Sequence, residues 1–226
     1  MAPTLSPTFT NQLKQTFQGI EMDQQFEKHR DIFRYYLATI DPRNYSFGQL
    51  AGVDSLLDSL LTLENPIVQD LCRCPNGHIH EDHSEYSASF VAGTTVSDTI
   101  QDWIDLRCQS GVHQCRECNS FCSQISTYNS PPIISFQLAD ALTTCNVVIS
   151  VQQKNGETLW YRLAGIIYFG DNHFVARIIR KDGQVWFYDG IGTGRNLIYE
   201  GSVQSNRLDL LSVSAKSACC AIYCLM

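Results

Sequence analysis

A histidine and an aspartate flank one predicted β-hairpin. Residues 172–190 read NHFVARIIRKDGQVWFYDG, two runs rich in β-branched and aromatic residues joined by an Asp-Gly pair that is typical of a tight turn. If the loop has three residues, Arg180 lies opposite Gln184. Asp189 then lies one diagonal step from His173 on the same face, close enough for the two side chains to form a hydrogen bond.

This pair predicts a base and the group that orients it. A carboxylate bound to an imidazole fixes the tautomer and the orientation of the ring, as general-base chemistry requires. We expect Nδ1 of His173 to lie within hydrogen-bond distance of the Asp189 carboxylate, with both side chains at an open cleft. The alternative is a sheet rim that carries two unrelated polar residues.

Cysteines provide a second group with possible chemistry. The chain has ten, and Cys72-Arg-Cys74 and Cys115-Arg-Glu-Cys118 form two close pairs. Two such pairs on hairpin turns are typical of a site in which four thiolates hold one zinc ion. We predict a structural zinc site whose ligands are Cys72, Cys74, Cys115 and Cys118. His78 is the substitute for Cys72, and thiols that bind no metal are the alternative. Other possible replacements or neighbours are His80, His83, Cys108, His113 and Cys122.

Composition limits the partners and the compartment. The 226 residues include 16 basic and 23 acidic ones, a formal net charge of −7, so nucleic acid is not expected as a partner. No apolar run reaches the length of about eighteen residues that a membrane span needs, and the opening MAPTLSPTFTNQ does not resemble a signal peptide. We therefore expect no membrane contact, a location in the cytosol or nucleus, and cysteines that are thiols or metal ligands.

The N-terminal part, residues 8–65, is predicted to be helical. Apolar residues recur at helical spacing over residues 8–40 and stop at Asp41-Pro42. The stretch FGQLAGVDSLLDSLLTL predicts a second helix from Phe47 to near Asn65-Pro66.

Residues 66–205 are predicted to be rich in β-strands. Turn signals separate short apolar segments, namely EYSASFVAG, PPIISFQL, CNVVISVQ, LWYRLAGIIYFG, HFVARIIR and QVWFYD. One helix is expected from about Val96 to Ile104, with Thr95 and Asp98 placed as a capping box. Residues 206–226 end in the Cys-rich SAKSACCAIYCLM, which shows no clear period, and are predicted to be an irregular tail.

The order of these features resembles that of the ubiquitin-specific proteases. The likeness is carried by WYRLAGIIYFG at 160–170, by Asn172-His173-Phe174 and by Tyr188-Asp189. In that family a Tyr-x-Leu strand leads to a Gly-rich loop, then to Gly-His-Tyr with the catalytic histidine, then to a strand that ends in an aromatic residue and an aspartate. The resemblance predicts a domain of this kind at residues 8–205.

The resemblance implies a fold and a chemistry. The implied fold is α+β, that of a papain-like cysteine protease with a helical lobe, an antiparallel β lobe and a zinc-bearing finger extension. The resemblance also implies that His173 is the catalytic base and Asp189 its orienting residue. The family reaction is thiol-dependent hydrolysis of ubiquitin conjugates, so ubiquitin or a ubiquitin-like protein is the expected partner and zinc the expected cofactor.

The family's nucleophile has no counterpart in this sequence. That cysteine belongs to an Asn-x-Gly-Asn-Thr-Cys-like segment upstream of all matched residues, whereas the first cysteine here is Cys72. We therefore expect a truncated or pseudo-enzyme form that binds ubiquitin. One alternative is an active deubiquitinase whose thiol is Cys122, Cys145, the Cys219-Cys220 pair or a cysteine of another chain. The other is a zinc-stabilised interaction domain unrelated to ubiquitin.

Overall fold

The chain forms two compact units, Met1–Glu64 and Asn65–Met226. The computed structural model describes residues 26–46, 52–63, 66–93, 98–109, 112–139, 143–153, 155–194, 196–204 and 208–226.

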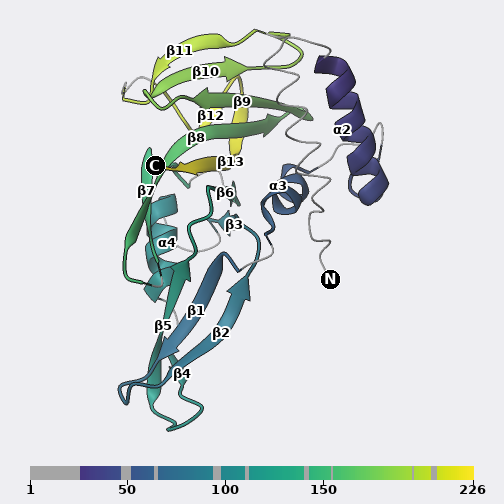
Figure 1. Ribbon diagram of the computed structural model, residues 1–226. Coiled ribbons are helices and arrows are strands. Elements are labelled where there is room, and N and C mark those ends of the chain that lie inside the picture. Colours follow the sequence, from purple (N-terminus) through teal and green to yellow (C-terminus); the bar gives the residue numbers. More distant parts are fainter. Residues whose placement is uncertain are drawn as a thin grey trace. The chain divides into compact units, whose positions relative to one another are not determined.

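The first unit contains the helices α2, Phe26–Ile40, and α3, Val53–Leu61 (Figure 1). Its core consists of buried and partly buried apolar side chains: Phe33, Tyr36, Leu37, Tyr45, Leu56 and Leu60. Helix α2 ends where the stop was predicted, because the Asp41 carboxylate accepts hydrogen bonds from the backbone N–H groups of Arg43 and Asn44. Gly52, Thr62 and Leu63 were predicted to be helical but lie outside α3. The other missing parts of the two predicted helices, at 8–25, 47–51 and 64–65, lie outside the described residues.

Helix α4 of the second unit, Ile100–Gln109, begins one turn later than predicted. The backbone N–H of Asp102 donates to the Thr99 hydroxyl, and the backbone N–H of Thr99 donates to the Asp102 carboxylate. These reciprocal bonds make Thr99 and Asp102 the capping box, in place of the predicted Thr95 and Asp98. Thr95 itself lies outside the described residues.

The smaller sheet of the second unit, here called the finger sheet, has the strand order β2-β1-β5-β4. Its strands are β1 (Val68–Arg73), β2 (Ile79–Glu85), β4 (Val112–Gln114) and β5 (Phe121–Tyr128). All neighbours are antiparallel, with Arg73 paired to both Ile79 and Ser123. The β1–β2 and β4–β5 turns therefore lie at the same end of the sheet (Figure 1).

Within the described residues, the larger sheet has nine strands in the order β11-β10-β9-β8-β13-β6-β3, with β12 paired to β13 and β7 to β8. Its strands are β3 (Ser89–Ala92), β6 (Ile133–Leu138), β7 (Val148–Gln152), β8 (Thr158–Gly170), β9 (His173–Ile179), β10 (Gln184–Tyr188), β11 (Ile198–Ser202), β12 (Ser212–Val213) and β13 (Lys216–Leu225). The pairing of β3 with β6 is parallel, and the other pairings are antiparallel.

The prediction of an irregular C-terminal tail is wrong, because β13 lies in the middle of the larger sheet. It pairs with β8 on one side and with β6 on the other. Ala221 and Tyr223 are completely buried, and the Tyr223 hydroxyl donates to the carbonyl of Asn146 at 2.9 Å. Buried residues alternate with partly exposed ones along β13 except at Cys220 and Ala221, which are both buried. Two register shifts against β8 interrupt the strand, so KSACCAIYCL shows no regular period.

The predicted α+β class is confirmed by largely antiparallel sheets with separate helices. Each of the six apolar segments predicted to form strands contains one, namely β3, β6, β7, β8, β9 and β10. Within the described residues, no helix combines the length and the apolar character needed to cross a membrane.

Candidate active site and candidate metal centre

The hairpin β9–β10 has the predicted register. Trp186 pairs with Ile178 and Phe187 with Arg177, and the backbone N–H of Arg180 donates to the carbonyl of Gln184. His173, the first residue of β9, therefore shares a sheet face with the buried residues Val175, Arg177 and Ile179. Asp189 directly follows β10 and lies on that face with the buried Val185.

His173 and Asp189 are hydrogen-bonded, through Nε2 and not through the predicted Nδ1. His173 Nε2 lies 2.7 Å from Asp189 Oδ1, and the two side chains are 26% and 22% exposed. Because an ionised carboxylate only accepts, the ring carries its proton on Nε2 in this arrangement. In a neutral ring, Nδ1 is then the nitrogen with a free lone pair, the atom at which the ring can accept a proton from another group.

The Asp189 carboxylate is held by the loop that follows it. Oδ1 also accepts the backbone N–H groups of Ile191 at 2.9 Å and Gly192 at 3.0 Å. These bonds, with Gly192 and His173 contributing most, lower the pKa of Asp189 to about 2. The Thr193 hydroxyl donates to the carbonyl of Asp189 at 2.8 Å and closes the loop. The carboxylate is therefore ionised and fixed in place at neutral pH.

None of the thiols is placed as a nucleophile for this base. In the part of the chain that the structure describes, which includes all ten cysteines, the only side chain hydrogen-bonded to His173 is Asp189. Burial raises the pKa of Cys145 to about 12 and that of Cys219 to about 11, and it also raises the pKa of Cys220. These thiols stay protonated at neutral pH and lack the imidazole contact that would activate them.

The candidate metal centre lies at the end of the finger sheet where its two turns meet. Cys74 and His78 flank the β1–β2 turn, and Cys115 and Cys118 belong to the β4–β5 turn. In the first turn the N–H of Gly77 donates to the carbonyl of Cys74 at 3.0 Å. In the second turn the N–H of Asn119 donates to the carbonyl of Cys115 at 2.9 Å. Each tight turn thus brings its two metal-ligating side chains to one point.

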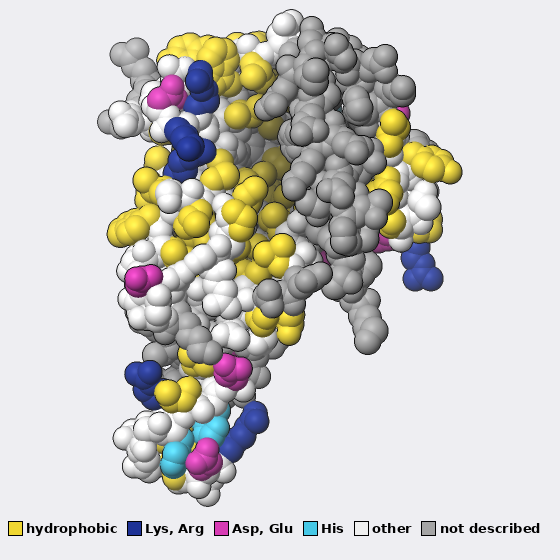
Figure 2. Space-filling model, in the orientation of Figure 1, with side chains coloured by type: hydrophobic (Ala, Val, Ile, Leu, Met, Phe, Trp, Pro, Cys, Tyr) yellow, Lys and Arg dark blue, Asp and Glu magenta, His cyan; other side chains and the backbone are white. Residues whose placement is uncertain are grey.

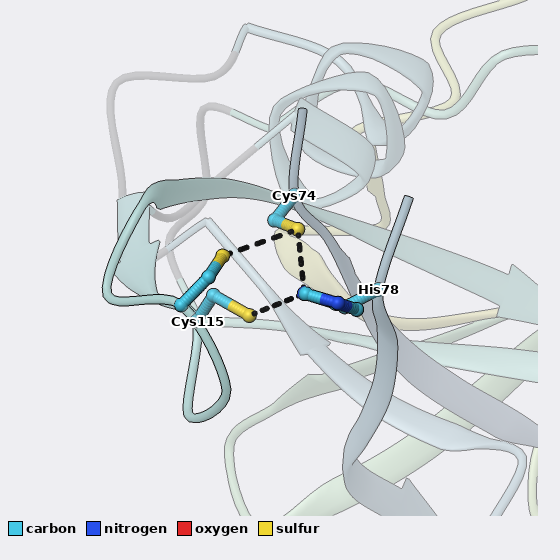
Figure 3. Close-up of side chains that lie close together, drawn as sticks. Cys74, His78 and Cys115 are labelled. Atoms are coloured by element: carbon cyan, nitrogen blue, oxygen red, sulfur yellow. Dashed lines mark hydrogen bonds between the residues drawn. The ribbon is translucent and has the colours of Figure 1, made fainter. Parts of the chain in front are cut away.

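The distances within this group fit a tetrahedral metal ion (Figure 3). His78 Nδ1 lies 3.5 Å from the sulfur atoms of both Cys74 and Cys115, and the sulfur atoms of Cys74 and Cys118 are 3.8 Å apart. A zinc ion about 2.3 Å from each sulfur and about 2.0–2.1 Å from a nitrogen separates sulfur from nitrogen by about 3.5 Å and sulfur from sulfur by about 3.8 Å. The three distances therefore agree with a Cys₃His centre that uses Nδ1.

His78, the substitute in our prediction, takes the position that was assigned to Cys72. The four ligand atoms of Cys74, His78, Cys115 and Cys118 all lie within 4.8 Å of one another. Cys72 is buried beside them on β1 but is not a member of this group. It precedes Cys74 by two residues of extended chain, which places it about 6.6 Å back along the strand.

Two thiols of the group are poised to ionise. Burial would raise the pKa of Cys115, but the backbone N–H of Glu117 and the ring of His80 lower it to about 5. Hydrogen bonds from the Ser120 hydroxyl and backbone lower the pKa of Cys118 to about 7. Thiolates are the form that binds metal, so these turns favour coordination. His80 was predicted only as one of several possible replacement ligands, and no sequence signal pointed to Glu117.

No family model matches the chain, and no curated protein matches it. Solved structures that resemble it include a MERS coronavirus papain-like protease, with 13% identity over 95% of this chain and 56% of that one and a TM-score of 0.49. Another is the Ubp8-Sgf11-Sgf73-Sus1 SAGA DUB module, with 12% identity over 92% of this chain and 50% of that one and a TM-score of 0.43. A third is the Saccharomyces cerevisiae Pan2 pseudoubiquitin hydrolase–RNA exonuclease module in complex with AAUUAA RNA. Its identity is 13% over 89% of this chain and 37% of that one, with a TM-score of 0.42.

These neighbours have ubiquitin-specific and papain-like protease folds, and this chain spans about half or less of two of them and 56% of the third. Their TM-scores are all below 0.5.

Proposed function

We propose that this chain is a ubiquitin-specific-protease-like domain that binds ubiquitin or a ubiquitin-like protein and does not itself hydrolyse ubiquitin conjugates. The observation that carries the proposal is the bond between His173 and Asp189, a base and its orienting carboxylate with no thiol of the chain at the remaining ring nitrogen. The motif resemblance around Trp160–Gly170, Asn172-His173-Phe174 and Tyr188-Asp189 supports the choice of partner.

His173 and Asp189 are arranged as thiol-dependent catalysis requires, but the thiol itself is missing. In such a reaction one imidazole nitrogen accepts the thiol proton while the other stays bound to the orienting carboxylate. His173 has Nε2 bound to Asp189 and Nδ1 available for that proton. Hydrolysis would need a thiol brought to Nδ1 by a further segment or by another chain.

We propose zinc as the metal of the Cys74, His78, Cys115 and Cys118 group. Three thiolates and one imidazole form a ligand set that zinc prefers, and four protein ligands leave no open position for a substrate. The role is therefore structural, namely to hold the two turns of the finger sheet together. The ten free thiols suit a reducing compartment, and we propose a location in the cytosol or nucleus.

Two measurements on the full chain test the function. Fluorescently labelled ubiquitin titrated with the protein should show saturable binding. Ubiquitin that carries a C-terminal electrophile should give no covalent adduct by mass spectrometry, and a fluorogenic ubiquitin substrate should not be cleaved. A cysteine deubiquitinase assayed in parallel verifies the reagents.

Two of three informative results would change the proposal. An adduct that disappears when one cysteine is replaced would identify a nucleophile and favour the active deubiquitinase. Cleavage that survives the substitution His173→Ala would point to a contaminating enzyme and would not count as activity of this site. Absence of ubiquitin binding together with bound zinc would overturn the ubiquitin connection and favour a zinc-stabilised interaction domain.

A further inference from the structure

Two side chains outside the ligand group contact the candidate metal centre. Glu117 Oε2 lies 3.5 Å from His78 Nε2, the ring nitrogen that faces away from the metal position. His80 Nε2 lies 3.2 Å from the sulfur of Cys115 and 3.9 Å from Glu117 Oε1. Figure 2 shows histidine side chains beside an acidic side chain at the bottom of the view, where Figure 1 places the turns of the finger sheet.

We propose that Glu117 and His80 are positioning residues of the metal centre, Glu117 by orienting the His78 ring and His80 by donating a hydrogen bond to the Cys115 thiolate. This inference rests on the zinc centre proposed above. In this role Glu117 and His80 raise the metal affinity above that of the four ligands alone.

The role of Glu117 follows from the tautomer that His78 needs. When Nδ1 binds a metal, the ring proton is on Nε2, and a carboxylate at that nitrogen fixes the ring and strengthens it as a ligand. Glu117 also contributes its backbone N–H to the sulfur of Cys115. Glu117 therefore bonds to Cys115 of its own turn and faces His78 of the other turn.

The role of His80 follows from the charge of the ligand set. Three thiolates and a neutral imidazole leave a zinc centre with one excess negative charge, and N–H donors to sulfur disperse that charge. His80 comes two residues after His78, so the two side chains face the same way along the extended chain. A metal-bound Cys115 is a thiolate and only accepts, which requires that His80 donate from Nε2.

The test measures metal affinity and the number of metal ions bound, using the full chain. Zinc affinity is determined by competition with a chromophoric chelator for the wild type, Glu117→Gln, Glu117→Ala and His80→Phe. Glu157→Gln is the matched control, because it removes one exposed carboxylate in the turn before β8, where Glu157 bonds to Asn155. Cobalt(II) binding reports the sulfur-to-metal charge-transfer bands.

We expect every variant to bind one metal ion per chain. Affinity should fall about 10- to 100-fold in Glu117→Ala and His80→Phe, less in Glu117→Gln, and not at all in Glu157→Gln. His80→Phe should also shift the charge-transfer band, because the Cys115 sulfur loses a hydrogen-bond donor. His80→Asn keeps an N–H donor and should recover part of the affinity, which separates the hydrogen bond from a folding defect.

The outcomes distinguish this inference from the zinc proposal. If the wild type binds no metal, the zinc centre itself is refuted. If the wild type binds metal and Glu117→Ala matches Glu157→Gln in affinity, the role of Glu117 is refuted while the centre stands. If His80→Phe loses the metal ion altogether and His80→Asn does not restore it, His80 is a ligand and not a positioning residue.

Discussion

The Asp189 carboxylate lies where a side chain at position 192 would be, and residue 192 is a glycine. A Cβ atom added at Gly192 would lie 2.9 Å from Asp189 Oδ2, a separation that real Cβ atoms essentially never show. The backbone N–H of the same glycine donates to Oδ1. Gly192 therefore determines both where the carboxylate lies and one of the bonds that keep it there.

The substitution Gly192→Ala should displace Asp189 from His173. We expect the ring to lose its preference for a proton on Nε2, which long-range ¹⁵N–¹H NMR correlations of a neutral imidazole report directly. Gly190→Ala is the matched control, because a Cβ atom there would be no closer than 3.5 Å to the Tyr188 side chain. Unchanged His173 correlations in Gly192→Ala would contradict the steric argument.

The ionised Asp189 should stabilise the fold in a defined pH range. Its pKa is lowered from 3.8 to about 2 by the N–H of Gly192, by His173 and by the N–H of Ile191. A carboxyl group with a lowered pKa contributes stability above its unfolded pKa, and that contribution disappears as the pH falls from about 4 to about 2. The difference in melting temperature between wild type and Asp189→Asn should therefore shrink over this range. A constant difference would argue against the carboxylate as its cause.

Metal binding should depend on Cys74 and His78 and not on Cys72. Metal analysis of the wild type purified without chelator should give about one zinc per chain, and a chelator should lower the melting temperature because structural metal binding stabilises the folded state. Cys74→Ala and His78→Ala should abolish binding, whereas Cys72→Ala should retain the ion. Loss of zinc in Cys72→Ala with retention in His78→Ala would restore the all-cysteine ligand set.

The hydroxyl of Tyr223 should measurably stabilise the larger sheet. It is completely buried and donates to the carbonyl of Asn146, so Tyr223→Phe leaves that carbonyl without its donor. We expect the free energy of unfolding in urea to fall by about 1–2 kcal/mol. Tyr199→Phe, which removes the hydroxyl of a half-exposed tyrosine on the edge strand β11, should change it little. Equal effects in the two variants would mean that β13 is not a core strand.

Short-range signals predicted the hairpin well. The Asp-Gly turn and two β-rich runs fixed which residues of β9 and β10 face each other, and this placed His173 near Asp189. The nitrogen was predicted incorrectly because strand register does not determine how the imidazole is rotated. The capping box was displaced for a similar reason, since Thr95-x-x-Asp98 and Thr99-x-x-Asp102 match one pattern and only tertiary contacts choose between them.

Long-range features were harder to predict. Strand β2, IHEDHSE, has too few apolar residues to show a strand period, and β13 has too few polar ones, so neither pattern indicated a strand. The spacing of the cysteine pairs predicted four thiolate ligands, but Pro75-Asn76-Gly77 forms a turn that brings His78 back to Cys74. Cys74, Cys115 and Cys118, which were predicted as ligands, do lie close together.

The position of β13 also sets the order in which the molecule can assemble during synthesis. Cys224 pairs with Ile133 on one side, and Leu225 pairs with Tyr161 on the other. Residue 225 must therefore emerge from the ribosome before β13 can pair fully with β6 and β8. Until then both strands expose unpaired edges, which favour aggregation. Distant pairings also fold slowly. The yield of folded protein in a cell should thus depend on chaperones that protect these edges during translation.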